Sequence, residues 1–298
     1  MLNCLVIKMH FSLFKFLVLP LLLSTGSAVL QGCDAVSNPA VITPVAVPIA
    51  VSMHTAAYFQ VSFLREPSGI VFHPHRNSLF AVSDEGSICE LSTDGTKKNM
   101  RTIRPADFEG ITVNPASGKL YIAVEGEEKV LQVDPVTLSV EREFSIDRSV
   151  NGAVVLAPGG QGIEAITYIP GTSATDQVTC VIANQGSKNS NPQDSPALFE
   201  ISLPVHTSSI VRISRFLPMG FSDVSGLHYD PASGNLVVIS DRNNRIYEFT
   251  RDAKLVRSHH LLGKDQEGIA IDNNGYIYIA QDSGGILKCK RTPGKKKP

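Results

Sequence analysis

The chain has 298 residues, of which 43% are hydrophobic and 18% are charged, a composition typical of a folded globular protein. Its 23 glycines and 18 prolines predict many turns between short elements. The formal net charge of −1 at pH 7 argues against a nucleic-acid partner, because domains that bind nucleic acids are usually strongly basic.

The N-terminus has the pattern of a bacterial export signal. Basic residues precede an apolar run from Phe16 to Leu23, and small residues follow up to the segment Leu30 to Cys33. This ending resembles a lipobox, in which the cysteine becomes the acylated mature N-terminus. We therefore predict a lipoprotein signal peptide at residues 1–32 and a lipid on Cys33. An uncleaved anchor and ordinary secretion are the alternatives.

The segment after the predicted cleavage site suits a tether. Residues 33–56 are rich in Pro, Val and Ala and carry few charges, which predicts an extended link between a lipid anchor and a folded body. Asp34, directly after the acylated cysteine, resembles the inner-membrane retention signal of enteric lipoproteins. The predicted location is therefore the cell envelope, on the periplasmic side of the inner membrane.

One pattern recurs five times in the rest of the chain. Each copy has an acid or Ser, a small residue, an aliphatic residue, a turn and further short strands, and the small residues are Gly69, Gly110, Ala165, Gly226 and Gly268. Copies are 41 to 61 residues apart, which fits about four short strands each. The sequence thus predicts an all-β fold, a five-bladed β-propeller of four-stranded antiparallel blades over residues 57–290. Residues 291–298 form a predicted disordered basic tail.

The second strand of each copy is almost entirely apolar, so we expect burial on both faces between neighbouring blades. These strands are Leu79–Val82, Leu120–Ala123, Thr179–Ile182, Leu236–Ile239 and Ile277–Ala280. The last copy lacks a fourth strand, whereas Tyr58–Phe63 precedes the first copy without a partner. We predict that this N-terminal strand closes the last blade and hides the exposed sheet edges. Cys89, Cys180 and Cys289 lie in apolar strand patterns and are expected to be buried free thiols.

Several motifs resemble one bacterial family. They include Glu66 to Ile70, Ser83 to Gly86, Asp107 to Ile111, Gln161 to Ala165, Ser225 to Leu227, Ser240-Asp241 and Gln266 to Ala270. Over Tyr58 to Cys289 the chain resembles the SdiA-regulated, YjiK-like family of envelope propellers. The resemblance implies a five-bladed propeller, distantly similar to NHL-repeat propellers, with a calcium site and an unidentified ligand. A lipobox is not implied by the family, so the anchor is predicted from this sequence alone.

Acidic residues recur at two places in the repeat that open on one face of a propeller, and we call this the acidic face. Converging carboxylates repel one another unless a cation neutralises them, and oxygen ligands favour Ca²⁺. The expected metal ligands are Glu109, Glu164, Asp241 and Glu267. The remaining residues of the face are expected to contact a ligand, and they are Glu66, Asp84, Glu125, Asn184, Asp223 and Asp282. The alternative is that a Glu before Gly only stabilises a tight turn.

The predicted function is a membrane-tethered propeller that binds Ca²⁺ and a small molecule, sugar or protein partner on the acidic face. A calcium-dependent lactonase, esterase or phytase-like hydrolase is the alternative, because Glu109 or Glu164, Asn184 and Asp241 provide a set of ligands. A purely structural envelope protein is a third possibility. No nucleophile elbow, P-loop or dinucleotide motif is present in the sequence. His73 and His75 lie in a turn on the opposite face and are expected to be solvated.

Overall fold

The computed structural model describes residues 52–157, 162–171, 176–186, 195–221 and 223–292, all within the unit Pro39–Pro298. These residues form strands joined by turns and loops, with no α-helix among them, so the all-β prediction is confirmed. Accordingly, no described segment is a helix capable of crossing a membrane. The predicted signal peptide and Cys33 lie outside the described residues.

Most strands belong to antiparallel runs of four that follow chain order. One run contains β2 (Pro67–His73), β3 (Ser78–Ser83), β4 (Ser87–Leu91) and β5 (Lys97–Thr102). Another contains β16 (Gly226–Asp230), β17 (Asn235–Ser240), β18 (Arg245–Phe249) and β19 (Leu255–His260). A third sheet joins β20 (Gln266–Ile271), β21 (Tyr276–Gln281) and β22 (Gly285–Thr292) to β1 (Ser52–Gln60).

An eight-stranded sheet contains two more such runs. The first has β6 (Asp107–Val113), β7 (Leu120–Glu125), β8 (Lys129–Val133) and β9 (Val140–Asp147), and the second has β12 (Ile163–Tyr168), β13 (Gln177–Asn184), β14 (Ala197–Pro204) and β15 (Ser209–Pro218). The two runs join where Ser209–Arg212 pairs in parallel with Phe144–Asp147. The short strands β10 (Ser149–Val150) and β11 (Ala153–Val154) form a separate hairpin.

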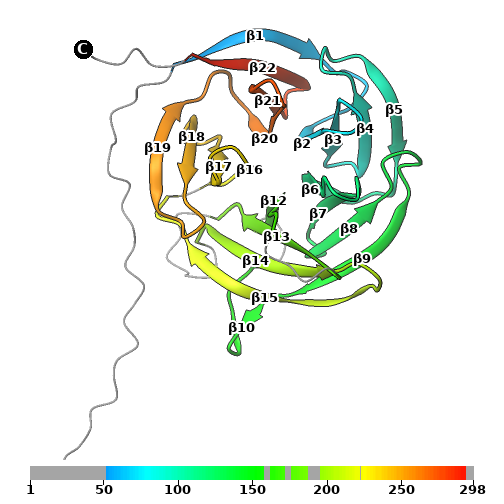
Figure 1. Cartoon of the computed structure of the whole chain (residues 1–298), viewed down its shortest axis with the longest axis vertical. Helices are drawn as coiled ribbons and strands as arrows, with labels where there is room; N and C mark the ends of the chain where they lie inside the picture. Colours follow the sequence, from blue (N-terminus) through cyan, green and yellow to red (C-terminus); the bar gives the residue numbers. More distant parts are fainter. Residues whose placement is uncertain (1–51, 158–161, 172–175, 187–194, 222, 293–298) are drawn as a thin grey trace, which may run out of the picture. The chain divides into compact units, whose positions relative to one another are not determined.

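The runs radiate from a common centre in a propeller-like arrangement (Figure 1). The strands β2, β6, β12, β16 and β20 lie nearest the centre, and we call them the inner strands. Small residues let their backbones approach closely. A Cβ on Gly226 would overlap the carbonyl oxygen of Glu267, and one on Gly268 would lie 2.7 Å from the amide nitrogen of Ile70. The repeated small residue is therefore a packing requirement at the centre.

Burial follows the predicted pattern of the second strands. Every residue of the five predicted apolar segments lies inside β3, β7, β13, β17 or β21 and is at most 5% exposed. Both faces of these strands are covered, because β-branched and aliphatic side chains from neighbouring runs pack against each side. Cys89, Cys180 and Cys289 are buried and free, as expected.

The N-terminal strand pairs with the C-terminal sheet, as predicted, but its bounds differ. β1 is antiparallel to β22, with Tyr58 opposite Leu287 and Gln60 opposite Gly285. It ends at Gln60 because the Leu64 amide then donates to the Val61 carbonyl in a turn that leads from the rim to β2 at the centre. β1 begins at Ser52, inside the range 33–56 assigned to the tether, and β22 extends to Thr292, beyond the predicted limit of 290.

The expectation of a solvated His73 is wrong. Its side chain is 2% exposed, and Nε2 lies 3.0 Å from the Gly118 carbonyl oxygen of the next run. Burial lowers the pKa of this imidazole. His73 thus connects two adjacent turns rather than facing water.

Candidate functional site

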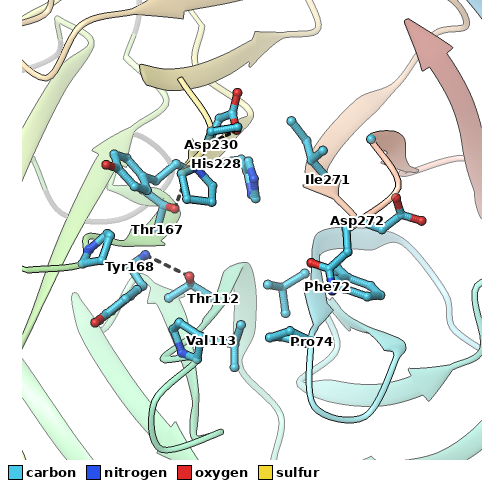
Figure 2. Close-up of a pocket in the computed structure, with 18 residues that line it drawn as sticks. Phe72, Pro74, Thr112, Val113, Thr167, Tyr168, His228, Asp230, Ile271 and Asp272 are labelled. Atoms are coloured by element: carbon cyan, nitrogen blue, oxygen red, sulfur yellow. Dashed lines mark hydrogen bonds between the residues drawn. The ribbon is translucent and has the colours of Figure 1, made fainter. Parts of the chain in front are cut away.

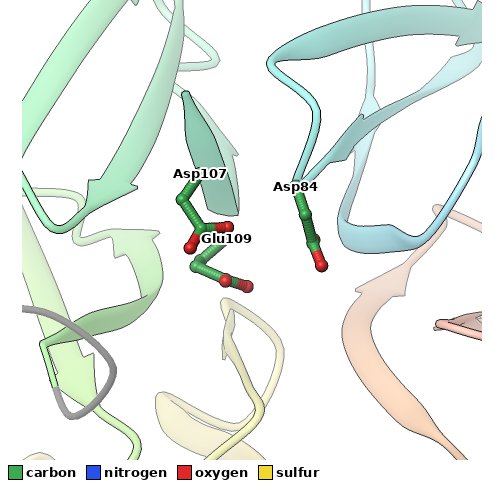
Figure 3. A group of neighbouring side chains, drawn as sticks. All are labelled: Asp84, Asp107 and Glu109. Carbon is green, nitrogen blue, oxygen red and sulfur yellow. The ribbon is translucent and has the colours of Figure 1, made fainter. Parts of the chain in front are cut away.

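Three carboxylates meet where β3 ends and β6 begins (Figure 3). One oxygen from each of Asp84, Asp107 and Glu109 lies within 4.8 Å of the others. Asp84 follows β3, and the other two open β6. Sequence analysis named Asp84 and Glu109 in separate roles and missed Asp107. Its signal was the spacing of two from Glu109, because alternate residues of a strand share a face.

Asp84 is held in an environment that opposes its charge. Burial, followed by the nearby charges of Asp107 and Asp282, raises its pKa to about 7. Its Oδ1 atom is buried and has no hydrogen-bond partner in the described part of the chain. A buried carboxylate oxygen without a donor is costly, so this atom is suited to a proton or a cation.

The acidic cluster continues along the centre through two glutamates. Glu109 and Glu164 line a space of about 10 Å³ between the inner strands, roughly the volume of a single water. Glu164 is only 6% exposed. Burial raises the pKa of both groups well above the ordinary value. The next largest cause is the charge of Glu164 for Glu109 and the charge of Glu125 for Glu164.

Glu267 lies at the equivalent place in the last repeat. Burial, then the charges of Asp241 and Asp282, raises its pKa to about 9. Asp241 uses Oδ1 to accept a hydrogen bond of 2.9 Å from the Gln266 amide. All four predicted metal ligands therefore lie on the acidic face, but only Glu109 belongs to the described group of closely spaced ligand atoms.

Serine replaces glutamate at this position in two repeats, and there the side chain bridges inner strands. The Ser68 hydroxyl donates to the Phe108 carbonyl, and the Ser225 hydroxyl donates to the Gln266 carbonyl at 2.7 Å. Each bond links one inner strand to the next. The serine hydroxyls therefore link neighbouring inner strands, whereas the glutamates at the equivalent positions repel one another.

The residues expected to contact a ligand separate into different roles. Glu125 accepts a hydrogen bond of 3.0 Å from the Gly162 amide, yet burial still raises its pKa to about 7. Burial and Glu66 raise the pKa of Asp282, whereas Glu66 itself pairs with Arg65. Asp223 is 4% exposed and accepts from the Arg242 amide at 2.8 Å, so it supports a loop.

Asn184 is held by two hydrogen bonds to the backbone. It is fully buried, its Oδ1 accepts from the Ala197 amide at 2.7 Å, and its Nδ2 donates to the Ser195 carbonyl at 3.2 Å. Both ends of the amide are thus engaged by backbone groups at the start of β14. The predicted ligand contact at Asn184 would have to compete with these two hydrogen bonds.

Comparison with known proteins agrees with this architecture. A model of the SdiA-regulated family matches residues 60–283. The chain is similar to glutaminyl cyclase of Myxococcus xanthus, with a TM-score of 0.58 and 13% identity over 80% of this chain and 96% of that chain. It is also similar to hydrazine synthase of Kuenenia stuttgartiensis, with a TM-score of 0.44 and 15% identity over 72% of this chain and 55% of that one. The first likeness supports a propeller-like fold and indicates nothing about activity.

Proposed function

This chain belongs to the SdiA-regulated family, and from that premise we propose that it is a membrane-tethered, five-bladed propeller that binds Ca²⁺ on its acidic face. The ion in turn supports recognition of a ligand or partner from the envelope. Cys33 carries the lipid that holds the protein on the periplasmic side of the inner membrane. The metal is central to this proposal, and the acidic cluster supports it.

The blade count rests on how the eight-stranded sheet is divided. Its runs β6–β9 and β12–β15 each have the order of an independent four-stranded sheet, and they share only four parallel pairs between outer strands. Counted separately, they join the three four-stranded sheets to give five blades. Each blade then begins with one inner strand and one copy of the sequence repeat.

The single observation that supports a cation most strongly is the set Asp84, Asp107 and Glu109. Their ligand atoms are mutually within 4.8 Å, and one oxygen of Asp84 is buried without a donor. Three carboxylates at that spacing repel one another, and a divalent cation removes the repulsion. Oxygen-only ligands suit Ca²⁺, which accepts six to eight ligands in irregular geometry, whereas Mg²⁺ demands a stricter octahedron.

The geometry adjusts the predicted ligand set. Glu109 stays in it, while Asp84 and Asp107 become the nearest further ligands. Glu164 is buried further along the centre, where burial and neighbouring carboxylates raise its pKa well above the ordinary value. Glu267 and Asp241 lie elsewhere on the acidic face, outside the closely spaced group. The proposed ion therefore lies to one side of the centre, beside β6.

Titration calorimetry of chelator-treated protein with CaCl₂ tests the metal. We expect one saturable site and a melting temperature that rises with excess Ca²⁺, because a ligand that binds only the folded state stabilises it. Glu109→Gln should remove most of that response. Glu85→Gln is the matched control, because Glu85 is an exposed acid beside Asp84 that lies outside the cluster. Absence of binding heat, with a melt that ignores the chelator, would refute the proposal.

The anchor requires a separate experiment. Cells given a labelled fatty acid should incorporate the label into the wild-type protein, and Cys33→Ser should abolish labelling and block processing. Cys89→Ser provides a control, because Cys89 is a buried body cysteine. Undiminished labelling of the Cys33 variant contradicts the lipoprotein prediction without affecting the metal site.

A further inference from the structure

A second cavity lies where the inner strands end, on the side opposite the acidic face (Figure 2). Its volume is about 590 Å³, within the range typical of small-molecule sites. All five inner strands or their following turns contribute to its wall. We call it the turn-side cavity and define it by Phe72, Tyr168, Tyr229, Pro74, Pro115 and Pro231.

The turn-side cavity is closed at its floor. The inner strands contact one another beneath it, and the space that remains among them is about 10 Å³. At most a water fits there, so a molecule in the turn-side cavity does not reach the carboxylates. The cavity is a cup with one opening rather than part of a continuous channel.

The charged side chains of the wall are two carboxylates, and each is held by its own turn. None of the eighteen described lining residues is Lys or Arg. Asp230 accepts from the Ala232 amide at 3.0 Å and from the Ser233 hydroxyl at 2.8 Å. Asp272 accepts from the Tyr276 amide at 2.9 Å and from the Tyr278 hydroxyl at 3.0 Å. Both carboxylates are therefore committed to their own turns.

The threonine hydroxyls of the wall are similarly engaged. Thr112 accepts from the Tyr168 amide at 2.9 Å, and Thr167 accepts from the Tyr229 amide at 2.8 Å. These bonds join successive inner strands. What the wall presents is mainly aromatic, aliphatic and proline surface, held by a scaffold in which Asp230, Asp272, Thr112 and Thr167 all accept hydrogen bonds.

We infer that the turn-side cavity binds a small, uncharged, largely apolar molecule with a ring. An anion would lose its hydration there and meet two carboxylates but no Lys or Arg, which is costly, and both carboxylates already accept hydrogen bonds from their own turns. A ring gains from the aromatic faces and fixed prolines, whose shape changes little on binding. This site is independent of the proposed cation and lies on the other face from the ligand expected in the sequence analysis.

A pair of dyes that share one carbon skeleton tests the inference. N-phenyl-1-naphthylamine is neutral, and 8-anilino-1-naphthalenesulfonate adds a sulfonate to the same two ring systems. In a fluorescence titration of the full chain we expect saturable one-to-one binding of the neutral dye. The sulfonate should bind at least about tenfold more weakly, a difference of about 1.4 kcal/mol. Chelator should not change the affinity for the neutral dye.

Two equivalent turns supply a matched pair of variants. Ala232 and Ala116 are exposed, occupy the same place in their turns, and donate through their amides to the Asp230 and Asn114 side chains, respectively. Only Ala232 lines the cavity. Ala232→Trp should therefore block the opening and weaken binding of the neutral dye at least about tenfold, whereas Ala116→Trp should bind it like the wild type.

Three results overturn the inference. They are no saturable binding of the neutral dye, equal binding of the two dyes, and equal loss in both tryptophan variants. Circular dichroism melts of each variant establish that the fold is intact. As an independent measurement, Tyr168→Ala removes one ring from the wall and should lower the affinity for the dye even if a tryptophan variant is poorly folded.

Discussion

The inner strands begin among carboxylates and end among rings and prolines, although the same segments build both ends. At the acidic face, Glu109, Glu164 and Glu267 are crowded until their pKa values rise. At the turn-side cavity, the carboxylates of Asp230 and Asp272 accept hydrogen bonds within their turns. One end stores electrostatic repulsion, whereas the other has its polar groups satisfied.

At both ends of the inner strands, hydroxyl groups form hydrogen bonds from one inner strand to the next. Near the acidic face, Ser68 and Ser225 donate to carbonyls of the next inner strand. Near the turn-side cavity, Thr112 and Thr167 accept from amides of the next inner strand. The inner strands are not paired with one another in any described sheet, and short side chains supply hydrogen bonds between them. The two ends therefore share the same close packing of the inner strands, and they differ in the side chains that these strands and their turns present.

Removal of β1 should have the largest effect, because it disturbs the frame that supports both ends. A chain that starts at Val61 leaves the edge of β22 unpaired and exposes backbone groups to aggregation. We expect insoluble protein or loss of a cooperative thermal transition. A chain that starts at Ser52 keeps β1 and should melt like the full chain. A soluble β1 deletion with an unchanged melt would contradict this account of closure.

The floor between the two ends predicts the next largest effect. Gly226→Ala places a Cβ against the Glu267 carbonyl and the Ile239 side chain, so we expect a loss of about 2–4 kcal/mol in unfolding free energy. Ala165→Gly is the control at the equivalent position of another repeat. It adds no atoms and should cost only about 1 kcal/mol. Urea unfolding measures both, and equal losses would show that the inner strands are not close-packed.

Much of the fold could be predicted from the sequence because close packing requires small or apolar residues at particular positions. Gly69 and Gly110 mark the register, since a Cβ at either position meets the neighbouring strand. The apolar segment Leu236–Ile239 likewise predicts a strand that is buried on both faces, as observed. The pairing of β1 with β22 could be inferred by counting strands. The glycines and the apolar segment are local signals in the sequence, whereas the pairing of β1 with β22 follows from the number of strands in each repeat.

The site was less predictable because its grouping depends on positions in space. The spacing of two relates Asp107 to Glu109 on one strand, but it does not show that both lie close to Asp84, which follows a different strand. Asn184 had the residue type of a ligand, but its amide is used by a nearby loop. The turn-side cavity is built from turns widely separated in the chain, so no single motif indicates it.

The third prediction sharpens the comparison through pH. In the calcium-free protein, burial and like charge raise the pKa of Asp84 and Glu125 to about 7 and that of Glu267 to about 9. The folded state therefore keeps protons that the unfolded chain releases near pH 4. This contribution to stability is complete below the unfolded pKa and is lost as the pH rises through about 7 and then about 9.

Thermal melts in chelator between pH 5 and pH 9 measure this loss, which should appear as a melting temperature that falls as the pH rises through about 7 and again toward about 9. Glu267→Gln should flatten the upper part of the curve, whereas Glu85→Gln, at an exposed position, should leave it unchanged. A calcium-free protein whose stability rises steadily with pH would show that the carboxylates are not crowded as described.

The smallest expected effect has the opposite sign and belongs to the other end of the molecule. Burial lowers the pKa of His73, whose Nε2 donates to the Gly118 carbonyl in its neutral form. The stability that this histidine contributes is therefore present above the unfolded pKa of about 6.5 and is lost as the pH falls through the folded value. His73→Gln keeps a donor without the titration, so the wild type should lose more stability than this variant between pH 7.5 and pH 5. Comparison of the two melts cancels the shared gain from the acidic face, and identical differences at both pH values would mean that His73 does not titrate with folding.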